Sequence, residues 1–236
     1  MRRWLAFLAM AVWVALVWAG LDWGAKASAP VLQSAGASAA KVLDWNTFFG
    51  RSVLSALPIA DRFDFPLRPP DGAGAYIGHP FGDGGHAGED WNTAVGDGDL
   101  GEPVHSPADG WVTLAMDFQS AWGKVILVDY RLPPGQTPPV VEMMFAHLSE
   151  MDVKAGDFVT RGQVIGKVGN DDGVYSAHLH WEVRNVLDLK LGGAYADDLA
   201  PWSPPSAFIA AHRGADGGTS KAKSLPKDDW ARWGGD

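Results

Sequence analysis

Short runs of apolar residues alternating with polar ones dominate the chain from Asp61 onward. Five of these runs are rich in β-branched and aromatic residues, and they lie at residues 110–118, 123–130, 140–148, 163–169 and 178–184. Turn-forming residues separate them, and no helical pattern of 10–15 residues comes between them, which argues against parallel βαβ units. The pattern therefore predicts an all-β domain, built as a compact antiparallel sheet or half-barrel.

The first residues have a different pattern. An uncharged apolar run extends from Trp4 to Leu21, directly after Arg2 and Arg3. Its length falls between the apolar segment of a signal peptide and the roughly 20 residues that span a bilayer. Both interpretations, a cleaved signal peptide and a retained membrane anchor, predict export of the remaining chain to the periplasm or cell envelope. A buried helix of a soluble protein is disfavoured because every face of the run is equally apolar.

A second helical pattern covers residues 42–57, where apolar residues recur at helical spacing until Pro58. The tail from about Gly214 is polar and contains several glycines, which is typical of a flexible segment. The predicted division is thus residues 1–29 as signal peptide or anchor, 30–60 as linker with a short N-terminal helix, 61–212 as the β domain, and 213–236 as a flexible tail.

Composition narrows the chemistry. The net charge of −9 and the pI of about 5.1 argue against a nucleic-acid partner, which would require a basic surface. The 236 residues include no cysteine, so disulfides and cysteine-ligated zinc sites are excluded. Any metal must be held by histidine, aspartate or glutamate. The sequence does not indicate an oligomeric state.

The segment HLHWEV, residues 178–183, places two histidines two positions apart. In a strand, alternate residues share a face, so His178, His180 and Glu182 lie on one side and the apolar residues between them on the other. Two imidazoles projecting side by side could bind one metal ion. Two solvent-exposed histidines on a half-buried sheet explain the pattern equally well.

The segment HAGED, residues 86–90, places a histidine four residues before an aspartate. Surrounding glycines make a helix improbable and favour an extended segment. His86 and Asp90 then share a face, and Gly88 between them leaves a gap that an ion of zinc's size could occupy. A glycine-rich loop with incidental polar residues is the alternative.

His147 stands near the end of the strand predicted over residues 140–148, on the same face as Met143. A lone histidine in such a position is more often structural than catalytic. Its place before the segment KAGDFVTRGQVIGKVGN, residues 154–170, makes it a candidate for function.

The segments HAGED, FAHL, AGDFVTRGQVIGKVGN and HLHWEVR, in this order, resemble the lysostaphin/LytM-type zinc metallopeptidases. These are secreted bacterial enzymes that cut peptide bonds in peptidoglycan. The resemblance extends from about Tyr76 to Arg184, and HPF at 79–81 and PVHSPADGWV at 103–112 are similar to the flanking segments of that family. It implies a lipoyl-hammerhead-like β fold.

The resemblance also implies roles for five side chains. His86, Asp90 and His180 match zinc ligands, and His147 and His178 match catalytic histidines. The expected cofactor is one Zn²⁺ per chain, and the expected substrate is the peptide stems and cross-links of peptidoglycan. His79 and His105 lie in flanking segments and are interpreted as structural or surface residues. The connection at 131–139 and the acidic segment at 96–103 depart from the family and are expected to affect specificity.

Three protein ligands leave one position of tetrahedral zinc open for water, as catalytic sites require. We expect His178 to act as the base toward that water and His147 to donate a hydrogen bond to the oxyanion, although exchanged roles are also compatible with the sequence. The alternative is a catalytically silent LytM-like module that binds the wall or activates an amidase. A lipoyl-type carrier is disfavoured because Lys154 and Lys167 lack the expected hairpin setting.

Overall fold

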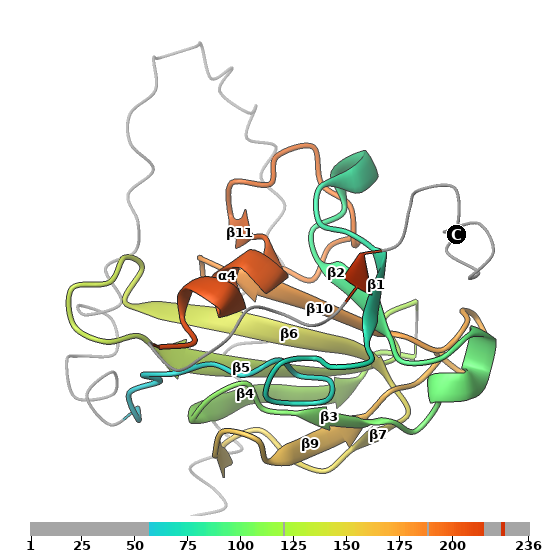
Figure 1. Ribbon diagram of the computed structural model, residues 1–236, viewed down its shortest axis with the longest axis horizontal. Coiled ribbons are helices and arrows are strands. Elements are labelled where there is room, and N and C mark those ends of the chain that lie inside the picture. Colours follow the sequence, from blue (N-terminus) through green and yellow to red (C-terminus); the bar gives the residue numbers. More distant parts are fainter. Residues whose placement is uncertain (1–56, 120, 188, 215–222, 225–236) are drawn as a thin grey trace, which may run out of the picture. The chain divides into compact units, whose positions relative to one another are not determined.

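A nine-stranded sheet organises the computed structural model, which describes residues 57–119, 121–187, 189–214 and 223–224 (Figure 1). Apart from the pairing of β1 with β12, its neighbouring strands are antiparallel. Strand β11 (Trp202–Ser203) also belongs to this sheet, but it pairs only with β10 and is not part of the linear strand order. The order of the others is β12 (Lys223–Ser224), β1 (Tyr76–His79), β2 (Glu89–Asn92), β10 (Leu179–Arg184), β6 (Val140–Leu148), β5 (Lys124–Arg131), β4 (Gly110–Asp117) and β8 (Phe158–Val159).

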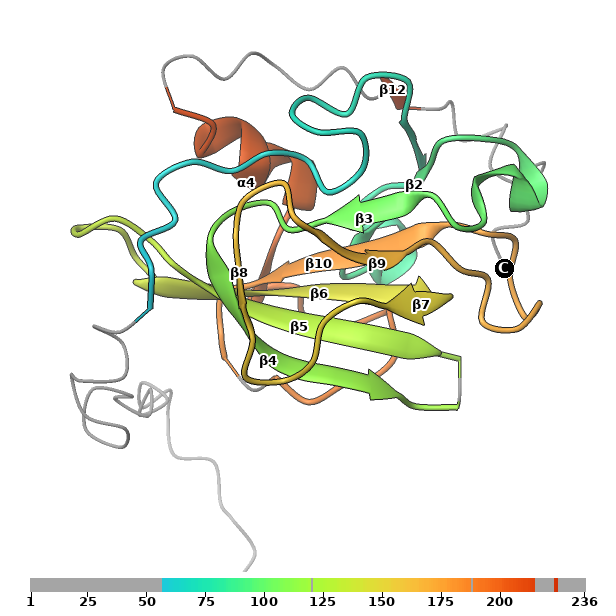
Figure 2. The same ribbon diagram turned by 90° about the horizontal axis from the view of Figure 1, so that it is seen from below.

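A smaller antiparallel sheet has the order β3 (Pro103–His105), β9 (Val164–Lys167) and β7 (Glu150–Met151), and Figure 2 shows these three strands together. The helical elements of the described residues are short. They are the 3₁₀ turns η1 (Asp83–Gly85) and η2 (Gly96–Asp99) and the helix α4 (Pro205–Ala211).

The all-β, antiparallel prediction is confirmed, and each of the five predicted strands is present with boundaries shifted by at most a few residues. Strands β1, β2 and β3 were not predicted, because glycines and prolines interrupt the alternation around them. The helix predicted over 42–57 and the apolar run from Trp4 to Leu21 lie outside the described residues, except for Leu57. Within the described ranges, no helix is long and apolar enough to cross a membrane.

The main core lies on one face of the large sheet. Trp181 of β10, Phe145 of β6 and Ile126 of β5 point into it, and the small sheet contributes Val104 and Ile165. A second, smaller apolar cluster lies on the opposite face and is formed by Val125, Leu127, Met144 and Ala146. Because both faces of β6 are covered, all nine of its residues are buried.

His147 departs from the alternation of β6. The sequence predicted that it would share a face with Met143, and this is wrong. Its φ of 59° lies in the left-handed region, and the β5–β6 register shifts between Lys124 and Ile126. The backbone turn places Leu148, rather than His147, in the main core with Phe145. His147 therefore faces the other side of the sheet, where His180 lies.

Candidate metal centre

Three strands and one turn bring the five predicted side chains together. His86 directly follows η1, Asp90 lies in β2, and His180 lies opposite Asp90 in the antiparallel β2–β10 pair. His178 comes just before β10, and His147 stands near the end of β6, beside β10 in the sheet. Residues separated by up to 94 positions in the sequence thus meet at one end of the sheet.

The three predicted ligands present one donor atom each to a common point. His86 Nε2 lies 3.1 Å from His180 Nδ1 and 3.5 Å from Asp90 Oδ1, and His180 Nδ1 lies 2.8 Å from the same oxygen. Donors held tetrahedrally at 2.0–2.1 Å from one zinc ion stand about 3.3–3.4 Å apart. Two sides of the donor triangle lie within about 0.2 Å of this spacing and the third is about 0.5 Å shorter, so the triangle has the approximate size and the chemical type of a zinc site.

Hydrogen bonds fix which nitrogen each ring turns toward this point. His86 Nδ1 lies 3.3 Å from the Pro80 carbonyl oxygen, to which it donates, so Nε2 is left as the donor atom for a metal. His180 Nε2 donates to Glu182 Oε1 at 3.1 Å, so Nδ1, which faces Asp90 Oδ1 at 2.8 Å, is the nitrogen left for a metal. Such outer hydrogen bonds are typical of metal-binding histidines, since they set the tautomer and the ring orientation.

Gly88 lets the His180 ring come close to the strand that carries Asp90. A Cβ at this position would lie 2.8 Å from His180 Cε1 and 2.6 Å from the Trp181 carbonyl oxygen. The space beside Gly88 is therefore filled by the His180 ring, while the donor atoms of His86 and Asp90 still face one common point. The absence of a side chain at residue 88 lets the third donor approach the first two.

His178 lies next to the donor triangle. Its Nδ1 lies 2.8 Å from the Ser176 carbonyl oxygen, to which it donates, and its Nε2 lies 3.8 Å from Asp90 Oδ1. In the neutral ring, this arrangement leaves the Nε2 lone pair facing the cluster. A basic nitrogen at that place can accept a proton from a group bound beside Asp90.

His147 lies between His178 and an aromatic wall. Its ring centroid is 4.8 Å from that of His178, and Trp122 stacks on its other side at 5.8 Å with an interplanar angle of 15°. The main-chain N–H of His147 donates to the Trp122 carbonyl, and Trp122 Nε1 donates to the Gly192 carbonyl. No described residue forms a hydrogen bond with His147 Nδ1, although this atom is buried. The ring is thus held in place by stacking and by the backbone.

Burial and neighbouring charges shift the pKa values of His147 and His180 in opposite directions. Burial, followed by the neighbouring His178 and His180, lowers the pKa of His147 to about 2, so this ring is neutral. Burial also lowers the pKa of His180, but Asp90 and Glu182 outweigh it and raise that pKa to about 9. Burial would raise the pKa of Asp90, whereas His178, His86 and His180 hold it well below its usual range. A carboxylate with this environment is ionised and suited to a cation.

His79 adds a further imidazole at the edge of the cluster. Its ring stacks on His86 at a centroid distance of 4.3 Å, and its Nδ1 lies 3.8 Å from Asp90 Oδ2. His79, His86 and Asp90 also bring three donor atoms within 4.8 Å of one another. We favour the set with His180 because its donor distances are shorter and hydrogen bonds orient both of its rings. The interpretation of His79 as merely structural or surface missed this contact.

One side of the cluster is open. The side chains of His86 and His180 are 1% exposed, whereas those of Asp90 and His178 are 18% and 16% exposed. A substrate can therefore approach past Asp90 and His178, while the opposite side is closed by protein.

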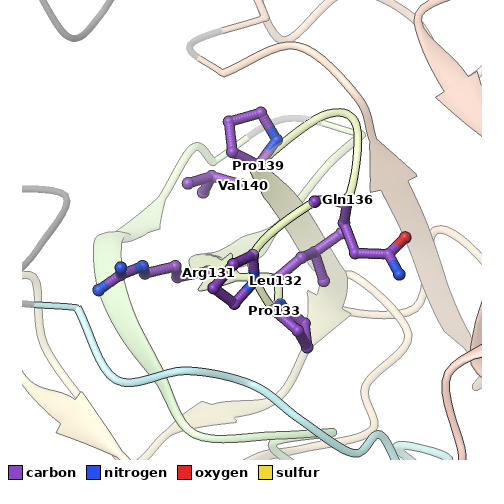
Figure 3. Close-up of a pocket in the computed structure, with 8 residues that line it drawn as sticks. Arg131, Leu132, Pro133, Gln136, Pro139 and Val140 are labelled. Carbon is purple, nitrogen blue, oxygen red and sulfur yellow. The ribbon is translucent and has the colours of Figure 1, made fainter.

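The acidic segment and the proline-rich connection occupy different places. Asp97 of η2 accepts the Ala177 N–H at 2.9 Å and so supports the segment that carries His178. The connection at 131–139 contributes to a surface pocket lined by residues 131–136, Pro139 and Val140 (Figure 3). It joins the other end of β6, about 20 Å of strand away from His147. Of these two segments, only the acidic one lies beside the histidine cluster.

Residues 84–194 match the model of peptidase family M23. The chain is 29% identical over 130 residues to the peptidoglycan DD-endopeptidase ShyA of Vibrio cholerae, covering 53% of this chain and 28% of that protein. It is 33% identical over 90 residues to the cell division protein DipM of Caulobacter vibrioides, covering 38% of this chain and 14% of that protein. Among solved structures, lysostaphin from Staphylococcus simulans is 26% identical over 61% of this chain and 52% of that chain, with a TM-score of 0.40.

The chain thus spans less than a third of the length of the two curated relatives. The family match includes all five predicted side chains, from His86 to His180. The resemblance to LytM-type peptidases, which rested on short segments of sequence, is confirmed at the level of the family.

Proposed function

We propose that the chain is a zinc-dependent endopeptidase that hydrolyses the peptide cross-links of bacterial peptidoglycan, since residues 84–194 match the model of peptidase family M23. The observation that carries this proposal is the donor triangle of His86, Asp90 and His180, whose sides of 2.8, 3.1 and 3.5 Å approach the spacing of donors around one tetrahedral ion. The name of the relative ShyA supports peptidoglycan as the substrate. A substrate of this kind implies a location in the cell envelope, with residues 4–21 as export signal or membrane anchor.

In this proposal His86 Nε2, Asp90 Oδ1 and His180 Nδ1 hold one zinc ion. When bound, zinc supplies a Lewis acid that polarises a carbonyl group and lowers the pKa of water toward about 7. Two neutral imidazoles and one carboxylate leave the site with a net positive charge. The buried Glu182 offsets part of it through His180.

His178 acts as the general base. Its Nε2 accepts a proton from the attacking water, the water oxygen forms a bond to the carbonyl carbon, and the same proton then passes to the leaving amine as the C–N bond breaks. His147 stays neutral, because its pKa is lowered to about 2, and its one ring N–H donates to the carbonyl oxygen as negative charge develops there. The Ser176 carbonyl supports this assignment of roles because it fixes the tautomer of His178.

The test is digestion of purified peptidoglycan by the full chain, with mass spectrometry of the released peptides. His180→Ala is expected to lose both zinc and hydrolysis, whereas His178→Ala is expected to keep zinc and lose about 10²–10⁴-fold in rate. His105→Ala is the control, because that ring bonds to the Pro66 carbonyl outside the cluster. Full activity of His180→Ala would refute the ligand set. Zinc binding without hydrolysis of any wall type would favour a silent module instead.

A further inference from the structure

Each strand that carries a predicted ligand also carries a buried carboxylate beside it. Glu182 follows His180 by two residues in β10, and Glu89 directly precedes Asp90 in β2. Their exposed fractions are 1% and 5%. Buried carboxylates of this kind require partners, because an unpaired charge is expensive to remove from water.

Glu182 has its partners on both oxygens. Its Oε1 accepts the hydrogen bond from His180 Nε2, and its Oε2 accepts from Arg184 Nε at 2.7 Å and from Trp202 Nε1 at 2.7 Å. The carboxylate is therefore held in one orientation from the side opposite His180. That orientation determines where the His180 ring points.

Glu89 is held in the same manner. Its Oε2 accepts from Trp91 Nε1 at 2.8 Å and from Ser206 Oγ at 2.5 Å, and its Oε1 accepts the Ser206 N–H at 3.3 Å. Because Glu89 and Asp90 are adjacent, fixing the Glu89 side chain fixes the strand position from which Asp90 projects to the other side.

Two of these donors come from the same short segment. Trp202 lies in β11, whose Ser203 and Trp202 pair with Val183 and Arg184, and Ser206 lies in the first turn of α4. This segment follows residue 194, where the match to the family ends. It is anchored independently, since Phe208 and Ile209 of α4 lie in the main core.

We propose that Trp202 and Ser206 are positioning residues of the metal centre. Each donates to a carboxylate that neighbours a ligand, so the segment after the family domain holds both ligand strands, β2 and β10, in the geometry that zinc requires. Neither residue contacts the donor triangle. This inference rests on the proposed zinc site. It adds the segment that carries Trp202 and Ser206 to the parts of the chain that hold this site in place.

The test measures zinc affinity of the full chain by competition with a chromogenic chelator, together with the visible spectrum of the cobalt(II) form. Trp202→Phe keeps an aromatic ring and removes the indole N–H, and Ser206→Ala removes the hydroxyl. Loss of an outer hydrogen-bond partner typically weakens metal binding 10–100-fold, so we expect zinc Kd to rise about tenfold in either variant, with a changed cobalt spectrum. Ser206→Thr retains a hydroxyl and should restore the zinc affinity.

Trp111→Phe is the matched control, because Trp111 of β4 stacks on Phe158 of the edge strand β8, away from the cluster. Thermal unfolding of the metal-free proteins separates positioning from stability. If both Trp202→Phe and Ser206→Ala bind zinc as the control does and show its cobalt spectrum, the inference is wrong. It is also wrong if the two variants differ from the control only in a lower unfolding temperature. Should Trp202→Phe fail to fold, Ser206→Ala and Ser206→Thr decide the question. Absence of zinc binding by the unaltered chain would instead refute the proposed function.

Discussion

Replacing Gly88 with alanine places a methyl group where the His180 ring now lies. The added Cβ would stand 2.6 Å from the Trp181 carbonyl oxygen and 2.8 Å from His180 Cε1. Ordinary contact begins at 3.4 Å, so the two distances are 0.8 Å and 0.6 Å too short. Either strand β10 or the His180 ring must move by several tenths of an ångström, whereas donors in a metal site keep their distances within about 0.2 Å.

The expected result of Gly88→Ala is a rise in zinc Kd of about 10–100-fold, the range seen when the support of a metal ligand is lost. Overpacking of this kind also lowers the free energy of unfolding by about 1–3 kcal/mol. Chelator competition measures the first effect, and urea denaturation of the metal-free protein measures the second. The rate of cross-link hydrolysis at limiting zinc should fall together with the affinity.

Gly192→Ala is the matched control, because a Cβ at residue 192 meets nothing within 4 Å. Neither Gly88 nor Gly192 has a left-handed backbone, so the two substitutions differ in available space rather than in backbone strain. If Gly88→Ala binds zinc as tightly as Gly192→Ala, the close approach of His180 to residue 88 does not position a ligand, and the geometric reasoning is refuted.

The surroundings of the cluster give three further predictions. Arg184→Met removes the cation that lies between the buried carboxylates of Glu142 and Glu182, and it should lower the free energy of unfolding by about 3–5 kcal/mol in urea titrations. A loss of only about 0–1 kcal/mol, the value typical of an exposed ion pair, would contradict the burial of this network. Metal-free His180 is protonated at neutral pH because its pKa is about 9, above the ordinary 6.5. Zinc must displace that proton, so zinc affinity should increase about tenfold per pH unit up to about pH 9. Calorimetry in buffers of different ionisation enthalpy measures the released proton, and zero release at pH 7 would be inconsistent with a charged ring. Trp122→Ala removes the ring that stacks on His147 and should lower kcat about 10²-fold in peptide-release assays, while Trp122→Phe retains most of the rate. An unchanged kcat for the alanine variant would show that stacking does not place His147.

The strand over residues 178–184 could be predicted because its alternation is uninterrupted. The segment 178–184 has an apolar residue at every second position, and the structure places Leu179, Trp181 and Val183 in the core and His180 on the other face. The same alternation failed at His147, because one residue with a left-handed backbone changes the face toward which the neighbouring side chains point. Periodicity contains no information about such a turn.

The meeting of the five predicted side chains was anticipated from the family resemblance rather than from spacing. Spacing alone indicated a gap between His86 and Asp90 and did not show that the His180 ring lies beside Gly88. The supporting residues Trp202 and Ser206 could not be predicted, since a hydrogen bond to a carboxylate over a hundred residues away, as between Ser206 and Glu89, leaves no local pattern in the sequence. Contacts of this kind are set by how β11 and α4 pack, which depends on the whole core.

Anomalous scattering at the zinc absorption edge, from crystals of the full chain grown with zinc, tests the central claim most directly. The proposal predicts one strong peak within about 2.0–2.2 Å of His86 Nε2, Asp90 Oδ1 and His180 Nδ1, with a fourth position not occupied by a protein side chain. A peak bound through His79 with His180 outside coordination distance would contradict the ligand set, and so would a zinc ion closed off by four protein ligands.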